Sequence, residues 1–355
     1  MTQIFKNALI DGKMLDIKTE NGKIIGIGIF DAEGYDLGGL SVFPGLVDIH
    51  THGCIGYDTM DGGHLDEMSG YLAKNGVTAW FPTTMTMDME TVQNVVNADI
   101  APNCGAEVCG FHMEGPYIAV SRKGAQNAEY IKNPDIEEFK KLKNISLVTV
   151  APELEGSMEF IKECDAVVCI GHTDADYDCS CRAMDCGARC LTHTFNAMPP
   201  LSHREPGPVG AAIDKNAYVQ VISDGLHIHK SVVMMLYRTF GADRMVLISD
   251  SMRATGLSDG EYDLGGQPIT VKNSVARTSD GTLAGSTSTR LQCVKKALEF
   301  GIPVNDAFKM ASQTPSELMH LNKGRIEVGY DADFIAFDDD FNLKLCVIGG
   351  EIYNK

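Results

Sequence analysis

The sequence predicts a (β/α)8 barrel of the TIM type, with a small β-sandwich domain built from both chain ends. Two observations predict this fold. Apolar strand-like segments alternate with helical segments through the middle of the chain, which is typical of a parallel sheet. Several of these segments end in a side chain that can bind a metal, move a proton or hold an anion. This recurrence indicates an active site at one rim, because barrel enzymes place their sites at the carboxyl ends of their strands.

Both chain ends contain short apolar runs broken by Gly and Asp, which are typical of hairpin strands. These runs are Ile4–Ile10 and Lys23–Gly28 at one end, and Ala332–Phe337 and Leu343–Ile348 at the other. We therefore predict that residues 1–46 and 330–355 form the β-sandwich. Residues 47–329 are then the inserted barrel.

The middle of the chain contains eight strand-like segments. They are Val42–His50, Val77–Thr83, Val108–Glu114, Ser146–Ala151, Ala166–His172, Arg189–His193, Tyr218–Ser223 and Met245–Asp250. The predicted helices include Leu65–Asn75, Met89–Asn97, Ile136–Lys143, Tyr177–Ala188, Lys230–Phe240, Thr289–Phe300, Val304–Ser312 and Pro315–His320. After the eighth strand, the Gly- and Thr-rich segment Tyr262–Ala284 predicts an inserted hairpin.

Composition restricts the class of protein. The 355 residues carry a formal net charge of -18 without a basic stripe, which argues against nucleic acid or an anionic membrane surface as a partner. Met1 to Asp11 lack the apolar core of a signal peptide, and no apolar stretch approaches the ~18 residues that span a bilayer. The spacing of the 11 cysteines does not match a disulfide framework. We expect a cytoplasmic protein with reduced thiols.

Metal-binding chemistry is predicted first at His50 and His52, which follow an apolar run. Residues two apart in a strand point to the same side, so both imidazoles can aim at one cation. Glu114, His172 and His193 end later strands, and we expect them to bind a second or shared cation, with Glu114 as a possible bridge. These ligands suit one or two divalent ions, zinc ahead of iron.

Asp250 ends the eighth strand and is the candidate for proton transfer. Beside a metal-bound water, a carboxylate can take the proton and later hand it to the leaving group. The alternative is a capping or turn aspartate, but the apolar run before Asp250 favours the catalytic role. His112 lies two residues before Glu114, and we expect it to support the ligands rather than only fill the interior.

The cysteine-rich stretch from Cys179 to Cys190 fits no zinc or iron–sulfur spacing. Cys179, Ala183 and Cys186 lie at helical intervals instead, which predicts packing in the core.

Several strings resemble known motifs. Phe43–Gly53 is similar to the first-strand motif of the amidohydrolase superfamily, and Lys323–Phe334 is similar to its closing motif. Within that superfamily the chain resembles the N-acetylglucosamine-6-phosphate deacetylase family over essentially its full length. The strings that carry this resemblance are Gly110–Pro116, Gly171–Ala175, Thr192–Met198, Pro199–Gly207 and Asp224–His227. Together they are highly specific, whereas any one alone is weak.

The resemblance implies roles position by position. Glu114, His172 and His193 match the family's metal ligands, and Asp250 matches its proton-transferring aspartate. A guanidinium offers paired donors to a tetrahedral anion, so Arg204 is the expected phosphate partner. The resemblance also implies a homodimer that can share phosphate contacts across its interface. The residues that match the family's sugar-phosphate contacts are Ala125, Gln126, Asn196, Ala197, Arg204, Asp224, His227, Leu283, Ala284 and Gly285.

Two positions depart from some family members. This chain has His50 where some members have Gln and lack the second metal position, so a two-metal site is open to it. Conversely, Gln126 stands where the best-known form has His after Lys-Gly-Ala. A Gln side chain can bond a sugar hydroxyl or carbonyl, but it cannot carry positive charge near neutral pH.

The expected activity is hydrolysis of the N-acetyl group of N-acetylglucosamine 6-phosphate by metal-activated water, with Asp250 as general base and acid. Three alternatives remain open. The first is another amidohydrolase, such as a deaminase or a dihydroorotase-like enzyme, because fold alone does not fix activity. The second is a galactosamine-selective deacetylase, and the third is a non-catalytic scaffold on the same fold.

Overall fold

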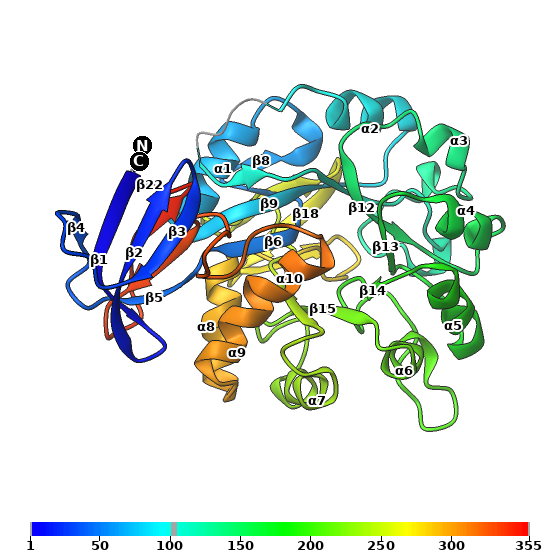
Figure 1. The fold of residues 1–355 in the computed structure, drawn as a ribbon. Helices are drawn as coiled ribbons and strands as arrows, with labels where there is room; N and C mark the ends of the chain where they lie inside the picture. The colour runs from blue at the N-terminus through cyan, green and yellow to red at the C-terminus, as the bar shows by residue number, and fades with distance from the viewer. Residues whose placement is uncertain (1, 101–104, 354–355) are drawn as a thin grey trace.

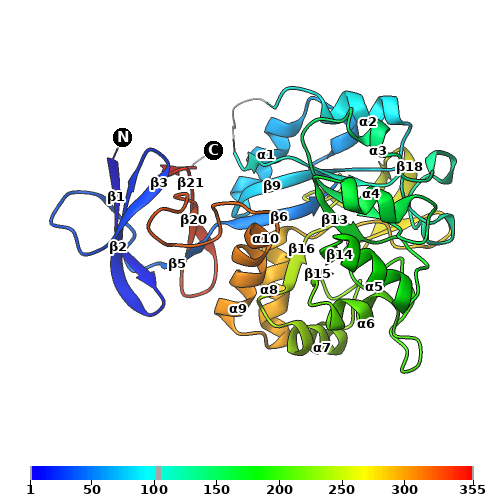
Figure 2. The ribbon, with the colours of Figure 1, turned by 45° about the vertical axis from the view of Figure 1, so that its right-hand side comes forward.

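The computed structural model describes residues 2–100 and 105–353. A barrel of parallel strands lies beside a mixed sheet made from both chain ends, as Figure 1 and Figure 2 show. The predicted fold class is therefore confirmed. The domain boundaries at residues 46 and 330 stay a prediction, and residues 1, 101–104, 354 and 355 of the predicted domains lie outside the described residues.

Eight parallel strands form the barrel wall. In order around it they are β6 (Leu46–Thr51), β9 (Val77–Thr84), β11 (Phe111–Glu114), β12 (Ile145–Val150), β13 (Val167–Ile170), β14 (Cys190–Leu191), β15 (Tyr218–Ile222) and β16 (Met245–Ile248). The short β10 (Glu107–Val108) pairs with β9 just before β11. The barrel nearly closes because the chain after β16 meets β6. There the Asp250 N–H donates to the His50 carbonyl at 2.9 Å, and the His52 N–H donates to the Ser251 carbonyl at 2.8 Å.

Helices cover the outside of the wall, and local sequence sets several of their ends. In α8, Thr289 and Gln292 form a reciprocal capping box at the first turn. Asp176 caps α5 and Gly187 follows its last residue. No helix in the described ranges is long and apolar enough to cross a membrane. The helices are α1 (Leu65–Lys74), α2 (Met89–Val96), α3 (Ile136–Phe139), α4 (Ser157–Glu163), α5 (Tyr177–Cys186), α6 (Gly207–Asp214), α7 (Lys230–Phe240), α8 (Arg290–Phe300), α9 (Val304–Ala311) and α10 (Gln313–Leu318).

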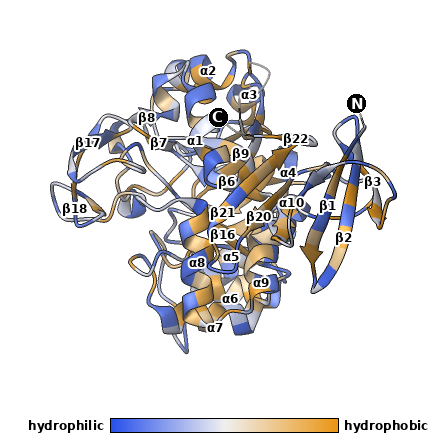
Figure 3. Cartoon of the chain, turned by 90° about the vertical axis from the view of Figure 1, so that its left-hand side faces the viewer, coloured by the Kyte–Doolittle hydropathy of each residue, from blue (hydrophilic) through white to orange (hydrophobic). Residues whose placement is uncertain are grey.

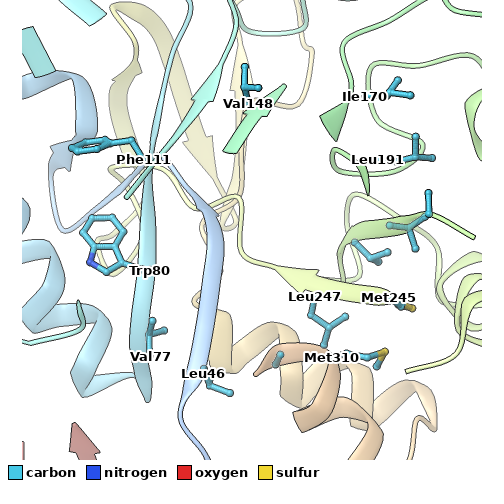
Figure 4. Close-up of a cluster of buried hydrophobic side chains, with 14 of the residues drawn as sticks. Leu46, Val77, Trp80, Phe111, Val148, Ile170, Leu191, Met245, Leu247 and Met310 are labelled. Carbon is cyan, nitrogen blue, oxygen red and sulfur yellow. The ribbon is translucent and has the colours of Figure 1, made fainter. Parts of the chain in front are cut away.

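Alternation along the strands divides the apolar residues into two cores. Outward residues such as Leu247 and Ile170 pack under the helices with Trp80 and Phe111 (Figure 4). Inward residues such as Val246 fill the barrel at the end away from the site. Figure 3 shows that the barrel strands are mostly orange while the outer helices carry both colours, as expected for buried strands beneath half-exposed helices. The barrel interior is therefore a layer of packed apolar side chains, and the polar side chains at the strand ends lie above this layer.

The two chain ends pair, as predicted, in one eight-stranded sheet. Its central strand β5 pairs with β1 on one side and with β20 on the other. Strands from both ends enclose a common core, in which the rings of Phe5 and Phe334 meet edge to face at 4.9 Å. The strands are β1 (Thr2–Ile10), β2 (Lys13–Glu20), β3 (Lys23–Gly28), β4 (Tyr35–Asp36), β5 (Ser41–Pro44), β20 (Phe334–Phe337), β21 (Leu343–Ile348) and β22 (Glu351–Ile352).

The predicted strand Val42–His50 is wrong as a single element. It is two strands in two different sheets, β5 and β6, joined at Gly45. A Cβ at Gly45 would lie 2.2 Å from Oγ1 and 2.3 Å from Cγ2 of Thr78, so the chain can pass here only without a side chain. The run is mostly apolar because both sheets bury it, and hydrophobicity alone therefore hides the break.

Other boundaries also differ from the sequence prediction. The strand predicted at Arg189–His193 contains only Cys190 and Leu191, because the chain turns into the barrel rim at His193. The predicted hairpin at Tyr262–Ala284 is a three-stranded sheet of β17 (Gly260–Leu264), β18 (Gln267–Lys272) and β19 (Val275–Thr278). Helices α4 and α6 are not among the segments named from the sequence. The minor elements are β7 (Gly53–Cys54), β8 (Tyr57–Asp58) and the 3-10 turns η1 (Thr59–Asp61), η2 (Val120–Arg122) and η3 (Ala128–Tyr130).

The Gly45 junction gives a stability prediction. Gly45→Ala should lower the free energy of unfolding by about 1–3 kcal/mol, because the new methyl group overpacks against Thr78. The matched control is Gly28→Ala, since a Cβ at Gly28 meets no heavy atom within 4 Å. That control should change stability by less than about 0.5 kcal/mol. Denaturant unfolding of the two variants checks this, and equal losses would contradict it.

Candidate metal and substrate site

The ends of five barrel strands bring six ionisable side chains together. Glu114 is the last residue of β11, and His50 lies within β6 with His52 just after it. His172, His193 and Asp250 are each the second residue after a strand, namely β13, β14 and β16. The potential ligand atoms form two groups, each within 4.8 Å: one contains His50, His52 and Glu114, and the other contains Glu114, His172 and His193. Glu114 is shared by both groups.

The distances within the two groups are short. Nε2 of His50 lies 3.2 Å from Nε2 of His52, and Nε2 of His172 lies 3.0 Å from Nε2 of His193. Oε1 of Glu114 lies 3.1 Å from His193 and 3.3 Å from His172. Oε2 of the same carboxylate lies 3.2 Å from Nε2 of His52. All five side chains are buried.

Hydrogen bonds to Nδ1 of three of these rings determine which ring nitrogen carries the proton in the neutral imidazole. Nδ1 of His52 faces the carbonyl oxygen of Thr83 at 3.2 Å, and Nδ1 of His172 faces that of Arg122 at 2.7 Å. Nδ1 of His50 faces Oε1 of Gln220 at 3.0 Å. Oxygens of this kind only accept, so each Nδ1 carries the proton and each neutral ring presents an Nε2 lone pair. Lone pairs that converge on one another and on a carboxylate fit a divalent cation.

Charge at the site points the same way. Burial lowers the pKa of His52, but Asp250 and Glu114 outweigh burial and raise it to about 10. Burial raises the pKa of Glu114, but His50 and His172 outweigh that effect and hold it well below its ordinary value. The carboxylates therefore stay ionised and favour positive charge, as a proton or a metal ion, where the imidazoles meet.

Asp250 lies at the edge of the first group. Its Oδ1 is 3.4 Å from Nε2 of both His50 and His52. Burial raises the pKa of Asp250, but the two histidines outweigh burial, so its pKa lies below the ordinary value. The carboxylate is thus ionised and able to accept a proton beside the metal ligands.

Backbone strain accompanies three of these residues. His172, His193 and Asp250 have φ values of 48°, 26° and 49°, in the left-handed region that side chains rarely adopt. Each of them is the second residue after a barrel strand, where the turn aims the side chain into the rim. Strain of this kind is concentrated at functional sites.

A cavity of about 500 Å³ opens above the ligands. Of the predicted substrate contacts, the structure places seven in its wall: Ala125, Gln126, Asn196, Ala197, His227, Leu283 and Gly285. Asp224, Ala284 and Arg204 do not line it. Ala284 is buried behind the wall, and Arg204 is exposed in the loop before α6, where its Nη1 lies 2.7 Å from Nε2 of His203.

Asp224 bonds His227 instead of lining the cavity. Its Oδ2 lies 2.7 Å from Nδ1 of His227, and its Oδ1 accepts from the backbone N–H of His227 at 2.9 Å. The pair fixes the imidazole so that the other ring nitrogen is available to the cavity. Burial raises the pKa of Asp224 and lowers that of His227, but their mutual attraction outweighs burial in both cases. The pKa of Asp224 is thus lowered and that of His227 is raised.

Several supporting residues were not predicted from the sequence. Gln220, which holds His50, is the one amide within the apolar strand β15, and that contrast is a signal that could have identified it. The backbone carbonyls that hold His52 and His172 leave no trace in residue type. Lys123 also lines the cavity, and its place directly before Gly124 and Ala125 is a signal that could have identified it. His112 contacts the ring of His50 edge-on at 4.5 Å and is in neither ligand group, consistent with a supporting role.

Comparison with known proteins is consistent with this geometry. The model of the amidohydrolase family matches residues 41–353. The chain belongs to the amidohydrolase family. This amidohydrolase is 37% identical to the N-acetylglucosamine-6-phosphate deacetylase of Vibrio furnissii, over 94% of this chain and 89% of the relative. It is 35% identical to the N-acetylgalactosamine-6-phosphate deacetylase of Escherichia coli O157:H7, over 87% of this chain and 86% of the relative.

A solved structure provides the comparison with a bound substrate. It is an aspartate-to-alanine mutant of the N-acetyl-D-glucosamine-6-phosphate deacetylase of Mycobacterium smegmatis, in complex with N-acetyl-D-glucosamine-6-phosphate. The TM-score is 0.91 at 28% identity, and the match covers 100% of this amidohydrolase and 99% of that chain. The family resemblance found in the sequence is therefore confirmed over the whole barrel and the terminal sheet.

The Asp224–His227 pair predicts a pH-dependent stability. The raised pKa of His227 makes its contribution complete below the unfolded value of about 6.5 and lost as pH rises through the folded value. The lowered pKa of Asp224 makes its contribution complete above about 3.9 and lost at lower pH. Asp224→Asn should therefore cost about 1.5–3 kcal/mol near pH 5.5 and less at pH 9.

Urea unfolding of metal-saturated protein at both pH values measures this cost. Asp185→Asn is the control, because the ion pair of Asp185 with Lys215 lies on the exposed surface. It should cost less than about 1 kcal/mol at either pH. A cost of Asp224→Asn that does not change with pH would contradict the assignment.

Proposed function

We propose that this chain hydrolyses the N-acetyl amide of N-acetylglucosamine 6-phosphate to acetate and glucosamine 6-phosphate. The observation that carries the proposal is the position of Asp250, whose carboxylate lies 3.4 Å from two imidazoles of a convergent ligand set at the base of a cavity. The relatives named above supply the substrate class, because they are deacetylases of phosphorylated N-acetylhexosamines.

We propose that His50, His52, Glu114, His172 and His193 hold two divalent cations, zinc ahead of iron. When bound, the metal supplies Lewis acidity, which lowers the pKa of water and stabilises negative charge on the acyl oxygen. The fit rests on the Nε2 lone pairs and on the carboxylate that the two ligand groups share. A non-catalytic scaffold would not need this complete set of ligands beside an ionised aspartate.

In this proposal Asp250 transfers the same proton in two successive steps. It accepts a proton from the water whose oxygen attacks the acetyl carbon, and it delivers that proton to the amide nitrogen as the C–N bond breaks. The products are acetate and a free amine. The pKa of Asp250, held low by His50 and His52, suits the first step, since the group must begin ionised.

The cavity wall positions the rest of the substrate in this proposal. Ala125, Asn196, Ala197 and His227 face the sugar, together with the segment Leu283–Gly285, while Asp224 orients His227. Arg204 binds the phosphate. Because Arg204 lies outside the cavity of its own chain, we propose that it serves the site of a second subunit in a cytoplasmic homodimer.

A galactosamine-configured substrate is the second candidate. It is favoured by the 35% identity to the N-acetylgalactosamine-6-phosphate deacetylase, close to the 37% identity to the glucosamine enzyme. The two substrates differ at one hydroxyl group. Relative kcat/KM values for the two sugars decide between them.

The activity is tested by acetate release from metal-quantified protein. Glucose- and galactose-configured N-acetylhexosamines, each with and without the 6-phosphate, form the panel. We expect the phosphorylated glucosamine derivative to give the highest kcat/KM. Asp250→Asn should lower kcat by at least about 100-fold, because an amide cannot carry the proton. The same variant should keep its metal content; turnover at the wild-type rate would refute the role of Asp250.

The position of Arg204 gives a complementation test. Arg204→Ala should raise KM for the phosphorylated sugar by roughly 10- to 100-fold, the loss expected for charge-assisted hydrogen bonds. Differently tagged Arg204→Ala and Asp250→Asn chains are then co-expressed, and the mixed dimer is purified. One of its two sites combines an intact Asp250 with Arg204 from the other chain, so low KM should return. A mixed dimer that stays defective would show that Arg204 acts within its own chain or has no role.

A further inference from the structure

Gln126 is buried at the base of the cavity, and both ends of its amide are already bonded within the protein. Only 2% of the surface of Gln126 is exposed. Oε1 accepts from the backbone N–H of Thr86 at 2.7 Å, and Nε2 donates to Oε2 of Glu114 at 2.8 Å. A backbone N–H can only donate, so the orientation of the amide is fixed and its NH2 group must face Glu114.

The oxygen that Gln126 holds is the one on the side of His52. Oε2 of Glu114 has Nε2 of His52 at 3.2 Å as its other neighbour. Oε1 faces His193 at 3.1 Å, His172 at 3.3 Å and His50 at 3.4 Å. Oε2 is thus the carboxylate oxygen on the His52 side, and Oε1 lies among the other three histidines. The last torsion of a glutamate is broad and soft, so an external donor is needed to keep this orientation.

We infer that Gln126 is a positioning residue that holds Glu114 as a carboxylate shared by two cations, and that it is not primarily a contact of the sugar. The inference rests on the two-cation site of the proposed function. It gives a physical reason for Gln126 in place of the His of the best-known family form. A neutral amide supplies a permanent hydrogen-bond donor without adding charge beside the five ligands. It also predicts which ion depends on Gln126, namely the one at His50 and His52, because Oε2 lies against His52 of that pair.

Two substitutions separate this role from general packing. Gln126→Met keeps the length of the side chain and removes both hydrogen bonds. Gln126→Glu keeps an acceptor for the Thr86 N–H but replaces the donor to Glu114 by an oxygen that repels it. Gln313→Met is the control for the same chemical change elsewhere, because Gln313 bonds Glu317 on α10, away from the cavity.

The readout is the number of zinc ions per chain after equilibrium dialysis at a series of free zinc concentrations, with circular dichroism to check the fold. Wild type and Gln313→Met should bind two ions. Both Gln126 variants should keep the first ion and bind the second about 10- to 100-fold more weakly, the loss typical of removing a partner of a metal ligand. If the Gln126→Glu protein bound both zinc ions as tightly as wild type, the inference would be overturned, since only the hydrogen bond to Thr86 would then matter.

Two further outcomes would also overturn it. One is a Gln126→Met protein that binds both ions normally and shows only a raised KM, as a sugar contact would. The other is a single ion in the wild-type chain, with deacetylation intact. By contrast, wild-type protein that binds two ions and releases no acetate would sink the proposed function and leave the role of Gln126 standing.

Discussion

The site depends on one constraint, the fixed tautomer of three buried histidines. The ring nitrogens of His50, His52 and His172 that point away from the centre each meet an oxygen that can only accept a hydrogen bond. The protons are thereby drawn to the outside, and lone pairs are left facing inward. The ion-binding character of the rim follows from this arrangement, since neutral imidazoles with inward lone pairs and an ionised carboxylate are the species that a divalent ion needs. Backbone carbonyls and one buried amide thus decide which nitrogen of each neutral ring faces the centre of the site.

The barrel makes this constraint possible because the carboxyl ends of its strands place residues side by side at one rim. In β11, His112 and Glu114 face inward while Phe111 and Met113 pack outward. In β16, Val246 and Ile248 fill the apolar layer, and Asp250 continues the same side into the rim. The apolar layer keeps water away from the lower side of the site, so the charges there interact more strongly than they would in solution.

Much of this was predictable from the sequence, because period-two alternation and polar residues at strand ends are local signals. The barrel, the pairing of the chain ends and the convergence of Glu114, His172 and His193 follow from them. What the sequence could not predict depends on contacts distant along the chain. The break at Gly45 is set by Thr78, the bond of Gln126 to Glu114 joins a loop to the end of strand β11, and the exposure of Arg204 depends on where its loop runs. Residue type alone does not report such encounters.

The order of strands in the terminal sheet also bears on how the chain is made. Strand β5 lies between β1 and β20, but β20 comes 290 residues after the end of β5. At about 5–20 residues per second, a ribosome needs roughly 15 to 60 s to supply that partner. Throughout this interval one edge of β5 has unpaired backbone groups while the whole catalytic barrel is synthesised beside it. Nascent chains of this protein therefore pass through a long window in which a chaperone or another open strand edge competes for β5.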